Sequence, residues 1–258
     1  MKIAIVGRGR VGRGLASALG ATKHSVRLVP GRQAVTLPEK TILLAVPDPS
    51  IANVAARLEL RPEQSVLHCS GSLGAEVLGG ASVGVMHPLV SFAEPSQPPR
   101  LEGTSFVIAG EARAVERARK IARAVGARAV FADVHGPTYH AAAALSANGA
   151  AALAAIAVRV FCGLGFGDKD ARRAIGALLR TVGENVERVG LPRALSGPVI
   201  RGDDGTVHRH RVALEVADPE ARAAYDAIAP AILDCARRAG LPDERAAAVL
   251  AALARTPR

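Results

Sequence analysis

Two hydrophobic patterns divide the chain near residue 135. As far as residue 133, short runs of β-branched and aliphatic residues alternate with amphipathic helical stretches. This alternation is typical of a doubly wound, mostly parallel α/β sheet, that is, a Rossmann fold. Seven strands are predicted, at Lys2–Val6, Ser25–Val29, Thr41–Val46, Ser65–His68, Ser82–Met86, Thr104–Ala109 and Ala127–Ala132. Three helices are predicted between them, at Gly12–Leu19, Pro49–Leu58 and Glu111–Val125.

The rest of the chain carries apolar residues at helical spacing and no strand pattern. Helices are predicted at 137–161, Lys169–Val189, Pro219–Ala239 and from Pro242 onward. The stretch Gly190–Leu214 is expected to be a long irregular loop. We therefore predict two domains, an α/β domain over residues 1–134 and an all-α domain over residues 135–258, with Gly136-Pro137 punctuating the boundary.

Composition and charge narrow the classes of protein. Hydrophobic residues form 49% of the 258, enough for a packed core. The net charge is +10, but the arginines are spread along amphipathic helices without a basic run, so we expect an anionic small molecule as partner and no nucleic acid. Three dispersed cysteines indicate a reducing compartment, and no uninterrupted apolar run reaches the ~18 residues of a membrane span. We expect a cytoplasmic protein without membrane contact.

A glycine-rich motif follows the first strand and opens the first helix. Gly7, Gly9 and Gly12 fit the dinucleotide-binding pattern in which glycines permit a tight turn, a close approach to the pyrophosphate and close helix packing. Arg10 and Val11 complete the predicted cofactor loop. The alternative is a glycine-rich turn that binds nothing.

The end of the second strand indicates which dinucleotide is bound. An NAD-binding domain usually has an acidic residue there to hold the ribose 2′-hydroxyl, whereas this chain has Arg32 and no acid. Arginine suits the 2′-phosphate of NADP(H), although Arg32 could also be a solvated surface residue. Only eleven residues separate Val29 from Thr41, so the helix between these strands is expected to be short or absent.

Polar residues follow three further strands. Val46 and Pro47 end the third, Ser70 follows the fourth and His87 ends the fifth. Because ligands of such sheets bind at the carboxyl ends of the strands, we assign Val46, Pro47 and Ser70 to the cofactor, Ser70 also to the substrate, and His87 to catalysis. His68, in contrast, is expected to be a packed strand residue.

Polar residues also interrupt the apolar helices of the second half. His140 and Asn148 lie about 80° apart on one helix, so both can face a cleft. We assign both to catalysis, with His140 as the first candidate for a proton donor. A structural role for His140 is equally open. Thr181 and Asn185 share a helix face, and Arg201 could hold a substrate carboxylate or pair with Asp203 or Asp204. His208 and His210 have no third ligand of matching type, so no metal site is expected.

Several segments, in this order and spacing, resemble one bacterial family. They read LLAVPD, LHCSGSLGAEVL, HPLVSF, YHAAAALSAN and LSGPVIRGD, and together they span most of the chain. The chain resembles Rossmann-like oxidoreductases with a C-terminal domain of unknown function, DUF2520, related in fold to pyrroline-5-carboxylate reductase and 6-phosphogluconate dehydrogenase. The resemblance implies NADP dependence and a helical domain that dimerises and completes the active site. Some relatives are similar to ketopantoate reductases, which implies a 2-oxo acid substrate.

These features together predict an NADP(H)-dependent oxidoreductase. It would reduce a small carbonyl or imine compound, of which a carboxylate such as a 2-oxo acid is the first candidate. The alternative is a catalytically silent NADP(H)-binding redox sensor, because fold alone does not separate an enzyme from a binding protein.

Overall fold

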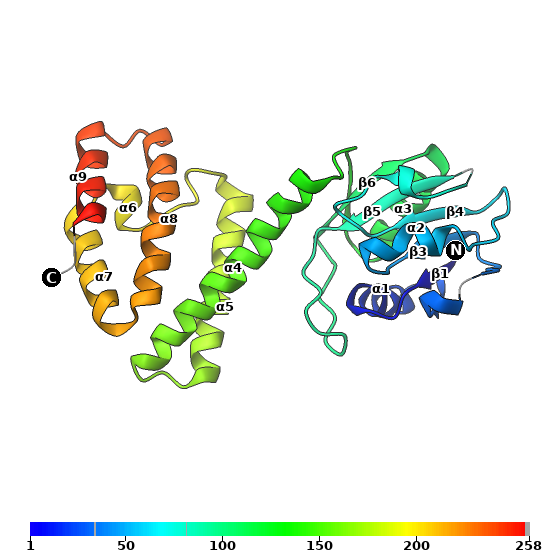
Figure 1. Cartoon of the computed structure of the whole chain (residues 1–258), viewed down its shortest axis with the longest axis horizontal. Coiled ribbons are helices and arrows are strands. Elements are labelled where there is room, and N and C mark those ends of the chain that lie inside the picture. The colour runs from blue at the N-terminus through cyan, green and yellow to red at the C-terminus, as the bar shows by residue number, and fades with distance from the viewer. Residues whose placement is uncertain (34, 81, 256–258) are drawn as a thin grey trace. The chain divides into compact units, whose positions relative to one another are not determined.

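The computed structural model describes residues 1–33, 35–80 and 82–255. In this part of the chain, seven strands form one sheet in the order β2-β1-β3-β4-β5-β6-β7 (Figure 1). Their bounds are β1 Lys2–Val6, β2 Ser25–Val29, β3 Thr41–Leu44, β4 Ser65–His68, β5 Val83–Pro88, β6 Ser105–Gly110 and β7 Arg128–Phe131. Strands β5 and β6 pair antiparallel, and the other neighbours pair parallel. The predicted α/β fold class is confirmed.

The strand order reverses between β1 and β3, and this reversal marks where a ligand is expected to bind. After β1 the chain passes through helix α1 (Arg10–Gly20) to β2, then crosses back to the other side of β1 to form β3. The crossover from β2 to β3 contains only the single 3₁₀ turn η1 (Gly31–Gln33) among its described residues, in agreement with the short helix expected from the spacing. Doubly wound sheets bind ligands at such a switch point, outside the carboxyl ends of the strands.

Each face of the sheet is covered by its own apolar cluster. On one face, α1 and α3 (Ala112–Ala124) pack Leu15, Leu19 and Ile121 against the sheet. On the other face, Ile51 and Val54 of the short helix α2 (Ile51–Ala55) do the same. Successive strand residues point to opposite faces, so a strand covered on both sides is apolar at nearly every position, as β1 and β3 are.

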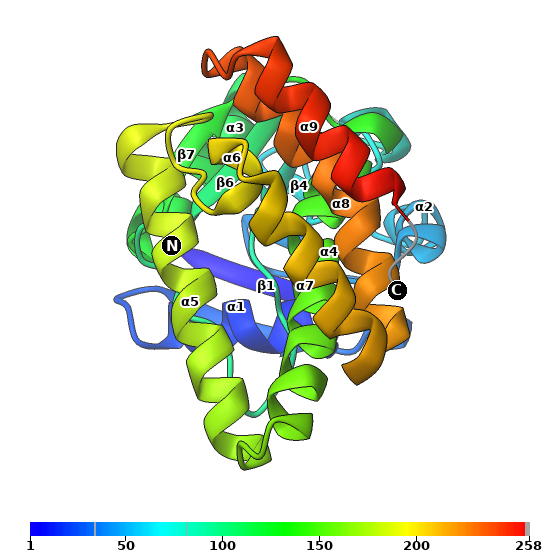
Figure 2. The same ribbon diagram turned by 90° about the vertical axis from the view of Figure 1, so that its left-hand side faces the viewer.

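The chain divides into two compact units, Met1–Ala147 and Asn148–Arg258. They meet inside helix α4 (Pro137–Gly163), whereas the sequence placed a boundary just before that helix. The second unit continues through helices α5 (Asp168–Val189), α6 (Pro198–Arg201), α7 (Asp204–Ala217), α8 (Pro219–Arg238) and α9 (Asp243–Ala254), which Figure 2 shows in yellow to red. Helices α6 to α9 share one apolar core, which includes Val199, Val207, Leu233 and Val249.

The expectation of an irregular stretch at Gly190–Leu214 is wrong for most of its length. Helices α6 and α7 occupy much of it, and Asp203 caps α7 by accepting a hydrogen bond from the Thr206 backbone N–H at 2.9 Å. Helix α7 contains Gly205, Thr206 and Val207 in its first turns, all of low intrinsic helix propensity, so its pattern is weak in sequence. Its apolar side is defined by tertiary packing, where Val207 is fully buried.

A buried arginine joins three helices of this core. Arg211 on α7 is 3% exposed and binds the Asp226 carboxylate of α8 through Nε at 2.7 Å and Nη2 at 3.0 Å. Its Nη1 donates to the carbonyl oxygens of Ala252 on α9 and of Arg255 just after it. A buried charge is stable only when it is paired and its donors are satisfied, and this arrangement meets both conditions.

Helices α4 and α5 expose much of their apolar surface within the described structure. None of the residues of α4 is buried, and Leu145 on α4 and Leu178 on α5 are 78% and 58% exposed. By length and composition alone α4 is apolar enough to cross a membrane, but one such helix is weak evidence, and Ser146, Asn148 and Arg159 interrupt it. An exposed apolar helix equally marks a surface that another protein covers.

Candidate active site

The glycine-rich turn is built so that larger residues do not fit at two positions. Gly7 has φ 121°, and a Cβ there would lie 2.2 Å from the carbonyl oxygen of Ala45 at the end of β3. A Cβ on Gly12 would lie 2.0 Å from the carbonyl oxygen of Gly7 itself, so α1 packs closely on the turn. A Cβ on Gly9 would meet no described atom within 4 Å, which leaves open space above the turn. The tight turn at Gly7 and the close helix packing at Gly12 agree with the sequence motif, and the open space at Gly9 is compatible with its predicted role.

Helix α1 begins at this turn with free donors. Its N-cap is Gly9, no described side chain caps it, and its first turn contains no acidic residue. The first backbone N–H groups of a helix lack partners within the helix and carry partial positive charge, so they favour an anion. Arg10 is exposed in the first turn and Val11 is half-buried beside it, while Arg13 donates to the Arg8 carbonyl at 2.9 Å and thereby orders the turn.

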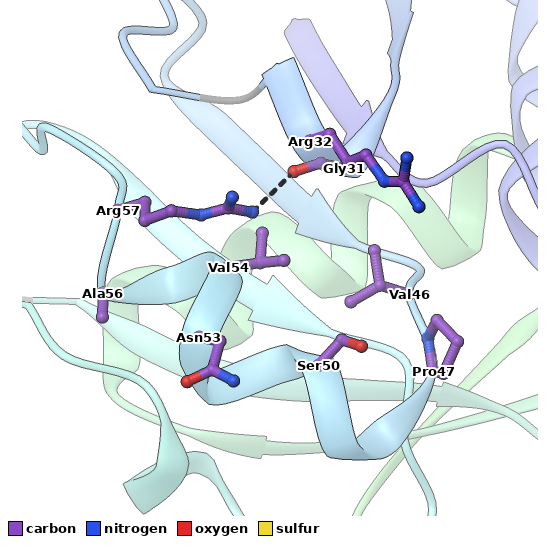
Figure 3. Close-up of a pocket in the computed structure, with 9 residues that line it drawn as sticks. All are labelled: Gly31, Arg32, Val46, Pro47, Ser50, Asn53, Val54, Ala56 and Arg57. Carbon is purple, nitrogen blue, oxygen red and sulfur yellow. Dashed lines mark hydrogen bonds between the residues drawn. The ribbon is translucent and has the colours of Figure 1, made fainter.

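A pocket of about 600 Å³ lies between the ends of β2 and β3 (Figure 3). Val46 and Pro47 line it from the end of β3, and Arg32 lines it from η1. Arg57, which follows α2, lines the same pocket and donates from Nη2 to the Gly31 carbonyl at 2.9 Å. The structure therefore places three of the predicted cofactor residues around one cavity next to the glycine-rich turn.

Ser70 takes part in a compact polar cluster beyond the end of β4. Its hydroxyl donates to Asp48 Oδ2 at 2.8 Å, and the Ser72 hydroxyl donates to the same oxygen at 2.5 Å. The Ser70 oxygen in turn accepts from the backbone N–H groups of Ser72 and Leu73. Asp48 at the end of β3 thus fixes the loop after β4.

His68 has the structural role expected of it. It is fully buried, and its Nδ1 accepts from the Ser70 backbone N–H at 3.2 Å, so its Nε2 carries the proton and donates to the Gly74 carbonyl at 2.9 Å. Burial lowers the pKa of His68. This histidine holds both ends of the loop that contains Ser70 and Gly71.

Three aromatic polar residues converge on Gly71. His87 on β5 is hydrogen-bonded through Nδ1 to the Tyr139 hydroxyl at 2.7 Å, and its ring centroid lies 6.3 Å from that of His140. A Cβ on Gly71 would lie 2.9 Å from His87 and 3.1 Å from His140, so only glycine permits this approach. The Gly71 carbonyl also accepts from the backbone N–H of Gly136, which fixes the start of α4 against the loop.

The charge states within this group follow from burial. Desolvation, assisted by His135 and His140, lowers the pKa of His87 to about 4, so its imidazole is neutral at pH 7. Burial raises the pKa of Tyr139, which keeps its hydroxyl protonated. His140 is exposed on the first turns of α4. Near neutral pH His87 is therefore a neutral hydrogen-bonding group, bonded to a protonated Tyr139 hydroxyl.

The remaining predicted residues belong to the second unit. Asn148 is exposed, two turns beyond His140 on α4. On α5, the Thr181 hydroxyl donates to the Leu178 carbonyl at 2.8 Å, and the Asn185 amide oxygen accepts from Arg188 at 3.1 Å. Arg201 ends α6 and is exposed; no described carboxylate forms a salt bridge within 4 Å of its guanidinium, but its charge is near enough to contribute to the lowered pKa of Asp203. These four residues remain candidates for the substrate.

Sequence reasoning missed four residues that the structure adds to the first unit. Asp48, Ser72, Arg57 and Tyr139 contact the predicted residues, but each comes from a different loop or helix. Of these four, only Asp48 could have been identified from the sequence as a site residue, because it lies in the loop just after a predicted strand. The others are identified only by three-dimensional proximity.

Fold and site together define a Rossmann-type protein with a helical C-terminal part. The sequence model of the family described as "Domain of unknown function (DUF2520)" matches residues 104–232, half of the chain. The protein belongs to this family. A comparison with curated proteins finds no match.

Solved structures share the fold at low sequence identity. A Thermotoga maritima protein is 24% identical with a TM-score of 0.66, and 92% of this chain and 99% of that one are covered. A Bacteroides fragilis protein provisionally named an NADP oxidoreductase is 19% identical with a TM-score of 0.71, covering 90% and 98%. Pyrroline carboxylate reductase of Plasmodium falciparum, solved with NADP bound, is 13% identical with a TM-score of 0.56, covering 92% and 98%.

Proposed function

We propose that this protein is a cytoplasmic, NADP(H)-dependent oxidoreductase that reduces a small carbonyl or imine compound. One observation carries the proposal. The glycine-rich turn follows β1, Val46 and Pro47 follow β3, Ser70 follows β4 and His87 ends β5, and these strands all run parallel. A site for a dinucleotide and a cluster of titratable side chains therefore share one edge of one sheet, as an oxidoreductase requires.

The residues of this chain fit the cofactor. The uncapped N-terminus of α1 and the open space at Gly9 suit a pyrophosphate, and the pocket between β2 and β3 suits an adenosine. Arg32 would hold the 2′-phosphate, which is why we propose NADP(H) over NAD(H). Bound in this way, NADPH supplies the hydride.

A hydride added to a carbonyl or imine carbon leaves a heteroatom that needs a proton. We assign its delivery to His140, which is exposed and lies beside the neutral, hydrogen-bonded His87. Tyr139 positions His87 through the 2.7 Å bond, and Asp48 positions the loop that brings Gly71 against both imidazoles. Asn148, further along the same helix, is a second candidate contact for the substrate.

We propose a carboxylate on the substrate because of Arg201. This exposed arginine has no described carboxylate within salt-bridge distance, although Asp203 is near enough to feel its charge, and it can bind a carboxylate through two parallel hydrogen bonds. Thr181 and Asn185, on the neighbouring helix α5 of the same unit, remain our proposed neutral contacts for the substrate, and Ser70 is the proposed contact in the first unit. A 2-oxo acid such as ketopantoate, or a cyclic imino acid, has the required combination of groups.

The test is NADPH oxidation with a panel of 2-oxo acids and cyclic imino acids. We expect turnover of at least one member, and we expect His140→Ala to lower that turnover ~10²–10⁴-fold while the Kd of NADPH stays nearly unchanged. His210→Ala, which removes an exposed histidine of α7, is the matched control and should keep full turnover.

Three results would contradict this function in different ways. Tight NADPH binding without oxidation of any panel member would favour the redox-sensor alternative. Absence of NADPH binding by calorimetry would remove the dinucleotide site itself. Normal turnover of His140→Ala would transfer the proton donor to another member of the cluster.

A further inference from the structure

We propose that Arg57 is a second arginine that contacts the 2′-phosphate of the cofactor and, with Arg32, determines the preference for NADP(H). The inference rests on the proposed function, because it assigns a new residue to the same cofactor site. A cofactor motif is normally identified in sequence at two places, the glycine-rich turn and the end of β2. Arg57 belongs to neither, because it follows α2.

The two arginines reach the pocket from different elements. Arg32 belongs to η1, after β2, and Arg57 follows the C-terminus of α2, after β3. Figure 3 shows their side chains on different sides of the Gly31 carbonyl, with Val46 and Val54 below them. A ribose bound between the ends of β2 and β3 would therefore have the Arg32 guanidinium on one side and the Arg57 guanidinium on the other.

A single hydrogen bond joins the two sides of the pocket. Arg57 Nη2 donates to the carbonyl oxygen of Gly31, the residue directly before Arg32. This bond ties the end of α2 to η1 and holds the backbone of Arg32 in place. Arg57 thus acts in two ways, by its own charge and by positioning Arg32.

The charge of Arg57 has no acidic partner within the part of the chain that the structure describes. Among the described residues, neither Arg32 nor Arg57 takes part in an ion pair, and none of those that line the pocket is acidic. A guanidinium has five N–H donors, and Arg57 uses one of them on Gly31 in the described structure. Two uncompensated guanidiniums around one pocket favour a dianion such as a phosphate monoester, which arginine binds through paired hydrogen bonds.

The test compares two fragments of the cofactor by calorimetry, adenosine 2′,5′-bisphosphate and adenosine 5′-monophosphate. They differ only in the 2′-phosphate. We expect the wild-type protein to bind the bisphosphate at least ~10-fold more tightly. Arg57→Gln should weaken the bisphosphate ~10-fold and leave the monophosphate within about twofold, because glutamine is polar but carries no charge.

Two further variants distinguish an effect of the charge at Arg57 from a general effect on the fold. Arg57→Glu should remove the preference for the bisphosphate altogether, since it places a negative charge at the 2′-phosphate. Arg123→Gln removes an exposed arginine from the last turn of α3 and should leave both affinities unchanged. Equal melting temperatures of the four proteins would confirm that the fold is intact.

Each contrary result has a distinct meaning. If Arg57→Gln weakens both fragments equally, Arg57 contacts the adenine or supports the pocket, and the proposal is wrong. If Arg57→Glu retains the wild-type preference, Arg57 does not face the phosphate, and the proposal is again wrong. If the wild-type protein binds neither fragment, the dinucleotide site fails and the proposed function fails with it.

Discussion

Arg32 is the residue at which the cofactor preference can be tested most directly. It lines the pocket between the ends of β2 and β3 from η1, and the chain has no acidic residue at that place to hold a free 2′-hydroxyl. We expect NADPH to bind at least ~10-fold more tightly than NADH, because a charge-assisted hydrogen bond contributes ~1.5–3 kcal/mol. Arg32→Glu should reverse or abolish this ratio in calorimetric titrations. Equal affinities for both cofactors in the wild-type protein would remove Arg32 from the site.

His87 makes the stability of the first unit depend on pH. Its pKa is lowered to about 4 in the folded protein, whereas in the unfolded chain it returns to about 6.5. Between these values the unfolded chain binds more protons, so the contribution of His87 is complete above pH 6.5 and is lost as pH falls toward 4.

The measurement is urea unfolding at pH 7 and pH 5, for the wild-type protein and for His87→Asn. We expect the wild-type protein to lose about 1–2 kcal/mol more than the variant between these two pH values. His24, His68 and His135 also have lowered pKa values and are present in both proteins, so the difference between the two proteins measures the His87 imidazole together with its coupling to His68, His135 and His140. Identical pH dependence of the two proteins would show that His87 titrates normally.

The sequence predicts candidate site residues where they lie at the carboxyl end of a strand. Arg32, Val46, Pro47 and Ser70 each follow a predicted strand, and parallel strands bring their carboxyl ends to one edge, so their proximity could be deduced. Tyr139 and Arg57 could not be found in this way. Their contacts with His87 and Gly31 connect residues 52 and 26 positions apart, which depends on helix orientation and side-chain rotamers.

At the scale of elements, the strands were more predictable than the helices of the second unit. Buried parallel strands are continuous apolar runs bounded by turns, and all seven predicted strands overlap the observed ones. Helices α6 and α7 were missed because the first is a single turn and the second begins with residues of low helix propensity. Helix α7 depends on its Asp203 cap and on packing against α8 and α9, which are tertiary properties.

The exposed apolar faces of α4 and α5 indicate an oligomer. Leu178 and Val182 are four residues apart on one face of α5, and both are more than two-fifths exposed. We propose that the helical part forms a homodimer through these faces. An obligate interface would bury more than ~2,000 Å².

Light scattering at micromolar concentration tests the dimer. We expect the wild-type protein to have the mass of two chains and Leu178→Glu to have the mass of one, because a charge in an apolar interface is costly. Val216→Glu is the matched control, since Val216 on α7 is 85% exposed and lies outside α4 and α5. A wild-type monomer under these conditions would falsify the proposal.

At the scale of the whole molecule, the two hydrophobic patterns correspond to two kinds of core. The sheet is covered on both faces by clusters from α1, α2 and α3, while α6 to α9 form a separate apolar core. The sequence shows the same change of pattern near residue 135, whereas the two compact units divide after Ala147. Helix α4 is continuous across this limit, so the helical spacing of its apolar residues does not change there.

Arg211 sets the order in which the growing chain can complete its structure. The sheet needs nothing beyond Phe131, so it can form while later residues are still being synthesised. The helical core differs, because Arg211 requires carbonyl oxygens 41 and 44 residues further along, at Ala252 and Arg255. A core that closed earlier would leave buried N–H groups without acceptors, at ~1–3 kcal/mol each. On the ribosome, the nascent protein therefore carries a finished sheet and a still open helical core until residue 255 has emerged.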